Sequence, residues 1–394
     1  MKSDFMFTSE SVTEGHPDKL CDQISDAILG RHLRQDPMAS VIAECAISTG
    51  IVFVAARVCS HAHIDIPATA RDVIARAGYD HNGFDVRNCT VMTSITDLPA
   101  RNEPRDESEL SDRELDEVPV QDQATVFGYA CDHNDHLMPL PIWLSHKLAR
   151  RISNMRRQGA LPYLAPDAKT QVGVEFRDHR PKRVHSIAIV ASQRDESSVT
   201  EARLREDLIE QIIEPTFDDE EIKVDGETKL FINPAGPVIG GGPSLHSGMT
   251  GRKTAVDTYG EYSRCSASAL SGKDPTRIDR IGAYAARHAA KNVVDAGMAQ
   301  ECEVQLSYSI GLARPVSVQV ETYGSSNVAD DQIADRLART LDFRLAGIIR
   351  RFRLRELSQA DDDGFYPKLA AFGHVGRPDL DLPWEATDVA ERLT

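Results

Sequence analysis

Apolar residues recur at three- and four-residue spacing through residues 18–34, with Leu20, Ile24 and Ile28 on one side. That spacing is typical of one face of an α-helix. The pattern predicts a helix over 18–34 whose solvent side carries Asp26 and Arg31.

The same reading divides the rest of the chain into alternating strands and helices. Further helices are predicted at residues 66–77, 140–157, 198–213, 284–296 and 330–345. Strands are predicted at residues 41–46, 50–58, 89–95, 122–129, 171–176, 186–192, 231–239, 304–309 and 316–320, with a turn at 82–83. Pairs of strands with intervening helices recur about three times, which indicates an α+β fold of repeated units.

Residues 97–123 break this pattern, because they are acidic and offer few apolar anchors. A long stretch of this kind inside a compact domain is usually a lid or a disordered segment. We therefore predict a mobile acidic surface loop at 101–121, with a solvated linker as the alternative. The predicted domains are 1–100, 122–230 and 231–394. The run 132–136 has metal-ligating residue types but is interpreted as a solvated turn, since adjacent loop residues rarely converge on one ion.

The composition narrows the class of protein. The 394 residues carry a net charge of −16, which argues against binding to nucleic acid or to an anionic membrane. The seven cysteines include no Cys-x-x-Cys pair, a pattern typical of reduced thiols. Because no leader peptide and no apolar run of membrane-spanning length is present, a cytoplasmic location is expected.

Three stretches carry the candidate chemistry. Residues 15–19, Gly-His-Pro-Asp-Lys, place an imidazole, a carboxylate and an ammonium just before the first helical pattern. Two basic, glycine-containing stretches follow far downstream, at residues 248–253 and 271–275. A carboxylate suits a hard cation, and a neighbouring histidine suits a phosphoryl oxygen or a proton. The set indicates a site for a phosphorylated substrate.

These stretches resemble the S-adenosylmethionine synthetase (methionine adenosyltransferase) family. The resemblance rests on Phe7 to Val12 with Gly15 to Lys19, on 161–172, on 250–260 and on 271–275, in the order in which the family has them. It covers the chain from Phe7 to about Trp384.

The resemblance implies three pseudo-symmetric α/β-sandwich domains. It also implies a homodimer, possibly paired into a tetramer, that buries flat sheets and shares two active sites. The implied reaction joins the sulfur of methionine to C5′ of ATP and releases tripolyphosphate, which is then cleaved to phosphate and pyrophosphate. The family uses Mg²⁺, with two ions expected per site, and K⁺.

The family pattern also assigns roles to positions of this chain. Catalytic roles fall on His16, Lys169, Arg252 and Lys273. Contacts to ATP fall on Asp122, Asp167, Lys253 and Arg277. Mg²⁺ is expected at Asp18 and Asp279, and K⁺ at Glu44.

Two departures affect the nucleophile side. Arg57 stands where the family has a glutamate that helps bind the methionine ammonium, and His246 stands where it has an aspartate. An aromatic ring that stacks on adenine and follows Gly-Arg in the family is also missing, since this chain has Gly236-Pro237-Val238 there. A unit charge pair at 4 Å is worth roughly 4 kcal/mol at an effective dielectric constant near 20, so an acid replaced by Arg57 would weaken ammonium binding strongly.

The primary hypothesis is S-adenosylmethionine synthesis. The alternatives are adenosyl transfer to a nucleophile that lacks a free α-ammonium, ATP tripolyphosphatase activity, and a non-catalytic subunit. Retention of the metal carboxylates and phosphate cations argues against the last of these.

Overall fold

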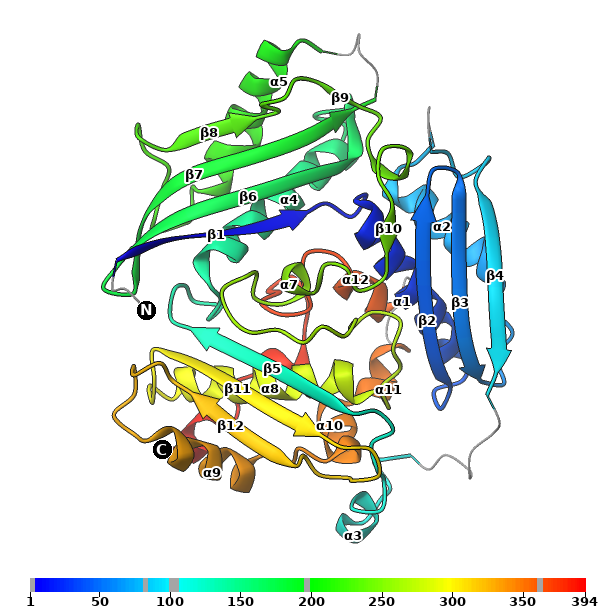
Figure 1. Ribbon diagram of the computed structural model, residues 1–394, viewed down its shortest axis with the longest axis vertical. Helices are drawn as coiled ribbons and strands as arrows, with labels where there is room; N and C mark the ends of the chain where they lie inside the picture. Colours follow the sequence, from blue (N-terminus) through cyan, green and yellow to red (C-terminus); the bar gives the residue numbers. More distant parts are fainter. Residues whose placement is uncertain (1–3, 81–83, 99–105, 195–198, 360–363) are drawn as a thin grey trace.

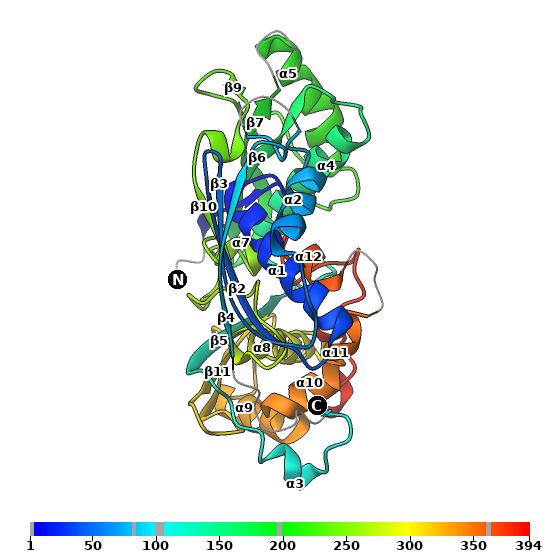
Figure 2. The same ribbon diagram turned by 90° about the vertical axis from the view of Figure 1, so that its right-hand side faces the viewer.

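Three β-sheets with attached helices form the molecule (Figure 1). The structure is a computed structural model that describes residues 4–80, 84–98, 106–194, 199–359 and 364–394. In the turned view the sheets lie on one side of the molecule and most helices, among them α1, α2 and α4, on the other (Figure 2). This arrangement confirms the predicted α+β class.

The first sheet has the strand order β1-β6-β7-β8, with β9 beside β7. Its strands are β1 (Phe5–Val12), β6 (Leu164–Arg177), β7 (Arg180–Gln193), β8 (Lys229–Ile232) and β9 (Val238–Ile239). Strand β1 pairs antiparallel with β6 over its whole length and brings Val12 opposite Lys169. Helix α4 (Leu140–Arg157) packs its buried leucines against the apolar side of β6 and β7. The segment that precedes His16 is therefore fixed to the strand that carries Asp167 and Lys169.

The second sheet has the order β10-β2-β3-β4. Its strands are β2 (Ser40–Ser48), β3 (Ile51–Cys59), β4 (Thr90–Asp97) and β10 (Gly248–Met249), and helices α1 (Pro17–Gln35) and α2 (Ile66–Ala77) belong to the same unit. Alternate residues of β2 and β3 are buried with α1 and α2 in one core. The opposite face leaves Ile51, Phe53, Met92 and Met249 exposed.

The third sheet has the order β12-β11-β5. Its strands are β5 (Ala124–Cys131), β11 (Glu301–Tyr308) and β12 (Ser317–Glu321). Helix α8 (Ile278–Asp295) packs on β5, where Gly128 lets the two backbones touch: a Cβ at that position would lie 1.9 Å from the carbonyl carbon of Ala286. The sheet and helix can approach this closely only with glycine at position 128.

Shorter elements complete the fold. They are α3 (Asp112–Leu115), α5 (Glu201–Leu208), a π-helix (Ile209–Ile213), α6 (Glu214–Thr216), α7 (Thr254–Asp257), α9 (Asp330–Thr340), α10 (Leu345–Phe352), α11 (Leu354–Leu357), α12 (Phe365–Leu369) and 3₁₀ turns at Gly242–Ser244, Pro383–Glu385 and Ala390–Arg392. Every sheet contains strands from distant parts of the sequence, so the linear domain limits 1–100, 122–230 and 231–394 stay a prediction.

Several sequence-based predictions need correction. The strand expected at 231–239 is two short strands, because Asn233 adopts a positive φ of 41° and its side chain bonds the backbone of Ala191. The helix expected over 330–345 ends at Thr340, and α10 starts separately at Leu345. Asp26 is fully buried and not solvent-facing. The predicted turn at 82–83 and the start of the 198–213 helix lie at residues outside those described.

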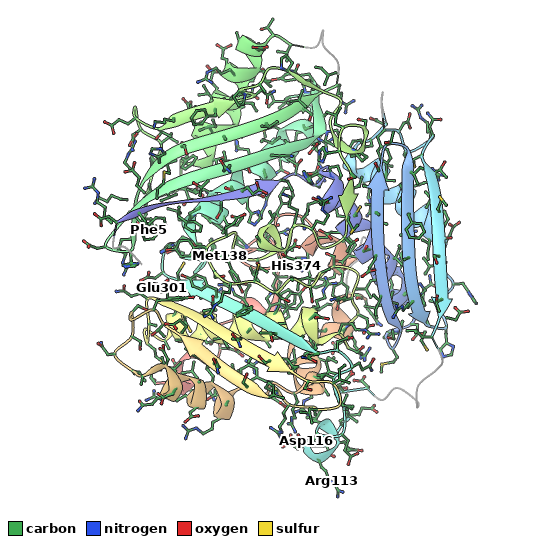
Figure 3. All side chains as sticks on the ribbon, viewed as in Figure 1. Phe5, Arg113, Asp116, Met138, Glu301 and His374 are labelled. Carbon is green, nitrogen blue, oxygen red and sulfur yellow. The ribbon has the colours of Figure 1, made fainter. Side chains whose placement is uncertain are left out.

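The acidic segment is anchored where it is described. Glu107 is buried and forms a two-pronged ion pair with Arg355, at 2.6 and 2.7 Å. Leu110 and Leu115 pack on Ala346 of α10, while Arg113 points outward from α3 (Figure 3) and Asp116 pairs with Arg314 and Arg344. The expectation of few apolar anchors is thus wrong for 106–121. Residues 101–105 lie outside the described ranges, and mobility of the loop stays a prediction.

The run 132–136 is a turn, as expected, but it is not fully solvated, since only Asp132 and Asp135 are exposed. Its histidines pack against aromatic rings: His133 lies 5.4 Å from the ring centres of Phe176 and Tyr262, and His136 lies 4.5 Å from that of Trp143. Within the described ranges, no helix is both long enough and apolar enough to span a bilayer. All seven cysteines are free thiols.

Candidate active site

The first chemical motif forms the entry to helix α1. His16 caps the helix, and its Nδ1 accepts a hydrogen bond from the backbone N–H of Asp18 at 3.2 Å. Gly15 touches the backbone of Pro166, and a Cβ there would lie 2.4 Å from the Pro166 carbonyl oxygen. The missing side chain of Gly15 therefore allows His16 to sit against the start of β6.

Three carboxylates on one face of α1 hold both basic loops. Asp18, Asp22 and Asp26 follow one another at four-residue spacing, which places them on the same side of a helix. Their oxygens accept backbone N–H groups of Met249 at 3.0 Å, Gly251 at 2.8 Å and Gly272 at 2.8 Å. We call these residues the α1 carboxylate row. It seats residues 248–253 and 271–275 along a single helix.

Both loops also run along the edge of strand β2 that faces away from β3. The N–H of Thr250 donates to the carbonyl of Cys45 at 2.9 Å, and the N–H of Ala43 donates to that of Gly272 at 2.8 Å. The three motifs that the sequence singled out are thus neighbours in space.

The cationic side chains of these loops lie beside the expected metal carboxylates. Arg252 Nη1 lies 3.6 Å from Asp18 Oδ1, and Lys273 Nζ lies 2.9 Å from Asp279 Oδ2. Lys253 binds Glu10 of β1 at 2.6 Å. Lys169 is exposed on β6 and contributes to the electrostatic field at His16. Cations and carboxylates that alternate in this way suit a metal-bound polyphosphate.

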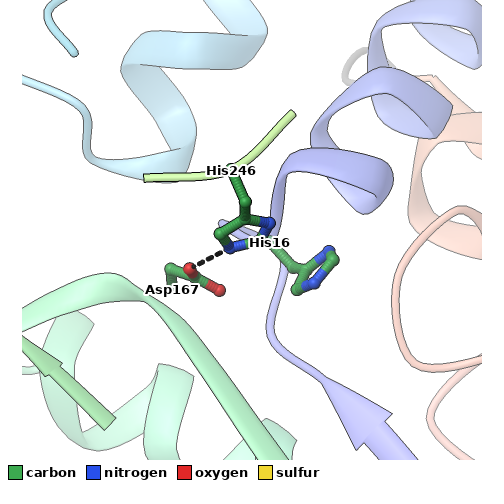
Figure 4. Close-up of side chains that lie close together, drawn as sticks. All are labelled: His16, Asp167 and His246. Carbon is green, nitrogen blue, oxygen red and sulfur yellow. Dashed lines mark hydrogen bonds and ion pairs between the residues drawn. The ribbon is translucent and has the colours of Figure 1, made fainter. Parts of the chain in front are cut away.

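His16, Asp167 and His246 converge from three different segments (Figure 4). His246 Nε2 lies 3.0 Å from Asp167 Oδ2, which also accepts the N–H of Gly242 at 2.8 Å. The rings of His16 and His246 are 4.9 Å apart. Asp167 Oδ1 is buried without a partner among the described residues, which leaves it free to accept a hydrogen bond from a bound group.

The electrostatics of this cluster fix its charge states. Burial lowers the pKa of His16 to about 3. The charge of Asp167 would raise this pKa, whereas His246, Lys169 and Lys253 lower it further. Burial alone would raise the pKa of Asp167, but hydrogen bonds from His246 and Gly242 and the field of His16 hold it below its usual value. His16 is therefore neutral and Asp167 ionised at neutral pH.

His16, Asp167 and His246 each place one potential ligand atom within 4.8 Å of the other two, which is the spacing of a possible metal site. The hydrogen bonding favours a different role. Because His16 Nδ1 accepts the Asp18 N–H, the neutral ring carries its proton on Nε2, which is then a donor and not a metal ligand.

The remaining predicted positions lie farther from this cluster. Arg277 Nη1 contacts Asp122 Oδ2 at 3.2 Å. Glu44 and Arg57 point from β2 and β3 toward the exposed face of the second sheet, where Arg57 is opposite Ile42. Among the described residues, no hydrogen bond or ion pair joins Arg57 to His246.

Sequence reasoning missed the buried charges beneath the loops. Lys19 is fully buried between Asp22, at 2.8 Å, and Asp257, with which it also forms an ion pair. Asp26 pairs with Arg280 of α8. The available signal was the four-residue repeat of aspartates within a helix that also carries many apolar residues, since an acid that becomes buried there needs a partner.

Comparison with known proteins places these features in context. Three sequence models match consecutive parts of the chain: the S-adenosylmethionine synthetase N-terminal domain at residues 4–99, the central domain at 117–238 and the C-terminal domain at 239–386. The S-adenosylmethionine synthase of Microcystis aeruginosa is 46% identical over 410 residues, covering 100% of this chain and 98% of the relative. Those of Rippkaea orientalis and Synechococcus elongatus are 44% and 46% identical and cover 96% and 97% of their own lengths.

Proposed function

The chain belongs to the S-adenosylmethionine synthetase family, and from this membership we propose that it is a methionine adenosyltransferase that makes S-adenosylmethionine from ATP and methionine. In the proposed reaction a lone pair of the methionine sulfur forms a bond to C5′ of ATP. The C5′–O bond breaks, and its electrons leave with tripolyphosphate. Water then cleaves tripolyphosphate to phosphate and pyrophosphate.

The α1 carboxylate row is the observation that carries this proposal. It fixes the loops of Arg252, Lys253 and Lys273 through their backbones, so the three side chains reach Asp18, Glu10 and Asp279 from fixed positions and would exchange these partners for phosphate oxygens when a polyphosphate binds. Donors that are held in place before the reaction stabilise charge that develops on a leaving group without reorganising. Lys169 would join them from β6.

His16 would act as a hydrogen-bond donor to the reacting 5′ oxygen. Its burial keeps the ring neutral, and the Asp18 N–H keeps the ring proton on Nε2. A neutral donor of fixed direction stabilises the oxygen as negative charge develops there. Asp167, with its unpartnered Oδ1, would accept a hydrogen bond from the nucleoside.

Asp18 and Asp279 would hold Mg²⁺, because both are buried carboxylates and carboxylate oxygens are the hard donors that Mg²⁺ prefers. When bound, Mg²⁺ would neutralise the polyphosphate charge. Glu44 alone supplies one carboxylate toward K⁺, so further oxygen ligands would have to come from outside this set. The proposed location is the cytoplasm, which the free cysteines support.

We further propose a homodimer formed through the exposed face of the second sheet. Ile51, Phe53 and Met92 form an apolar strip there, flanked by Glu44 and Arg57. Exposed apolar patches of this kind mark protein interfaces. A second chain on this face would place Arg57 at the edge of a shared site. Sedimentation velocity, which measures the mass of the assembly, distinguishes such a dimer from a tetramer of two dimers.

The test is a product analysis by mass spectrometry after incubation with ATP, Mg²⁺ and K⁺, with and without methionine. S-adenosylmethionine with phosphate and pyrophosphate is the expected result. ATP cleavage that does not need methionine would instead identify a tripolyphosphatase. Arg57 and His246, which replace two acids of the family, favour a nucleophile without an ammonium, and a parallel incubation with N-acetylmethionine tests that alternative.

A further inference from the structure

A charged cavity, separate from the candidate active site, lies on the helical side of the molecule, away from the exposed sheet face. It measures about 460 Å³ and lies between α1, α2, α4, α12 and the segment 371–380. Five cationic side chains line it: Arg76, Arg150, Arg157, Lys368 and Arg377. We call it the arginine groove. Its charge is opposite to that of the chain, whose net charge is −16.

The acids of the groove are shared among more cations than they can neutralise. Asp379 accepts hydrogen bonds from both Arg150, at 2.9 Å, and Arg377, at 2.9 Å from Nε and from Nη2. Glu14 similarly pairs with Arg156 at 2.8 Å and Arg157 at 3.0 Å. Two carboxylates thus serve four guanidinium groups, and the lining keeps an excess of positive charge.

Arg150 shows that this excess is unsatisfied. Its Nε is buried and has no hydrogen-bond partner among the described residues. Burial and the nearby charge of Arg377 lower the pKa of Arg150 to about 10. A buried guanidinium with a free N–H is costly unless an acceptor meets it.

We propose that the arginine groove binds a compact phosphate-bearing polyanion with at least two phosphoryl groups. Guanidinium groups bind phosphoryl oxygens with two parallel hydrogen bonds, and several of them around one cavity suit a polyvalent ligand better than a monovalent one. The volume lies within the roughly 300–1,000 Å³ of small-molecule sites. An inorganic pyrophosphate and the diphosphate of a nucleotide share this chemistry.

The groove also lies behind the loop that bears His16. Glu14 lines it and directly precedes Gly15, and the carbonyl of Glu14 accepts a hydrogen bond from Gln23 at 2.7 Å. The groove is nevertheless separate from the proposed phosphate site, because none of the residues that line it belongs to the loops at 248–253 and 271–275.

The test is calorimetric titration of the full-length protein with pyrophosphate in buffer without divalent metals. Two sites per chain are expected. Arg150→Gln should weaken one site at least tenfold, and Arg252→Ala should weaken the other. Arg180→Gln removes an equally charged side chain at the start of β7, where Arg180 pairs with Asp132 of the turn after β5, and it should leave both sites intact.

Arg76→Gln is a second variant of the same groove, in case the Arg150 variant misfolds. Because Arg76 is exposed on α2, its replacement should weaken the same site and leave the melting temperature unchanged. Parallel titrations with ADP and with phosphate identify the source: tighter ADP binding at the Arg150-dependent site would assign a nucleotide. A single site that Arg150→Gln and Arg76→Gln leave unchanged would overturn the proposal. That result would not affect the adenosyltransferase proposal, because that proposal is tested by analysis of the reaction products and not by pyrophosphate binding.

Discussion

Asp26 of α1 and Arg280 of α8 form a fully buried, two-pronged ion pair, with the Asp26 oxygens 2.7 and 3.0 Å from Arg280 Nη1 and Nη2. Asp26 also accepts the N–H of Gly272. The pair therefore joins two helices and one of the basic loops, and it fixes Lys273 and Asp279 relative to the rest of the α1 carboxylate row.

Breaking that pair should destabilise the fold. Arg280→Met leaves Asp26 buried without its countercharge, and loss of one partner of a buried pair typically costs about 3–5 kcal/mol. Chemical denaturation at pH 7 measures the change. The exposed pair of Arg183 and Asp225 is the comparison: Arg183→Met should cost under about 1 kcal/mol. Equal losses in the two variants would contradict a structural role for Arg280.

Lys169→Ala should lower kcat by roughly 10²–10³-fold at saturating ATP, because the variant loses a cation that stabilises the leaving tripolyphosphate. Asp18→Ala should have an effect of similar size through loss of metal binding. Steady-state rates are the measurement, and Lys182→Ala, an exposed lysine on β7, is the control. Unchanged rates for Lys169→Ala would remove it from the site.

Arg57→Glu should change the choice of nucleophile and leave ATP binding nearly intact. The substitution turns a repulsive charge into an attractive one for the methionine ammonium, and roughly 4 kcal/mol per close charge pair is an upper guide to its size. We expect the KM for methionine to fall at least tenfold, with the KM for ATP changed less than twofold. Arg177→Glu, on the outer end of β6, controls for the general change in charge. If ATP binding collapses, Arg57 belongs to the phosphate site instead.

Phe53→Asp should shift the protein toward monomers, because it places a charge in the apolar strip that we assign to the dimer contact. Sedimentation velocity reports the change in mass. Phe231→Asp tests the specificity of the effect, since Phe231 is similarly exposed, 47% against 41% for Phe53, but lies on the first sheet. Dissociation by Phe231→Asp and not by Phe53→Asp would move the interface to that sheet.

His133 should make the fold sensitive to mild acid. Burial, with the charge of Arg180, lowers its pKa to about 3, whereas an unfolded histidine titrates near 6.5. Between those values only the unfolded state takes up the proton, so stability falls as the pH falls from about 6.5 toward 3. Going from pH 7 to pH 5 should cost about 2 kcal/mol through this group.

Urea denaturation at pH 7 and pH 5 measures that loss. His133→Leu should lose about 2 kcal/mol less than the unmodified protein over this interval, whereas His61→Leu, at an exposed position, should lose as much as the unmodified protein. If His133→Leu and the unmodified protein lose the same amount, His133 accepts its proton in the folded state without cost.

Most helices could be predicted because their signals are local. The limits of 66–77 and 140–157 agree with α2 and α4, where apolar spacing and the flanking glycine or prolines act within a few residues. The family could be predicted for the same reason, since each of its motifs is a short run of fixed residues. Predictions failed where the conformation depends on a partner that is distant in the sequence. At Asn233, for example, a hydrogen bond to Ala191 divides the expected strand in two.

Most element types, the three charged motifs and the family could be read from the amino-acid sequence alone. The burial of Asp26, the pairing of β1 with β6 and the contact of His246 with Asp167 became evident only from the folded chain. The reason is physical. Whether a carboxylate is buried or exposed depends on its countercharge, and the countercharge of Asp26 lies 254 positions away in the chain. Local patterns of polarity carry no information about such a partner until the chain has folded.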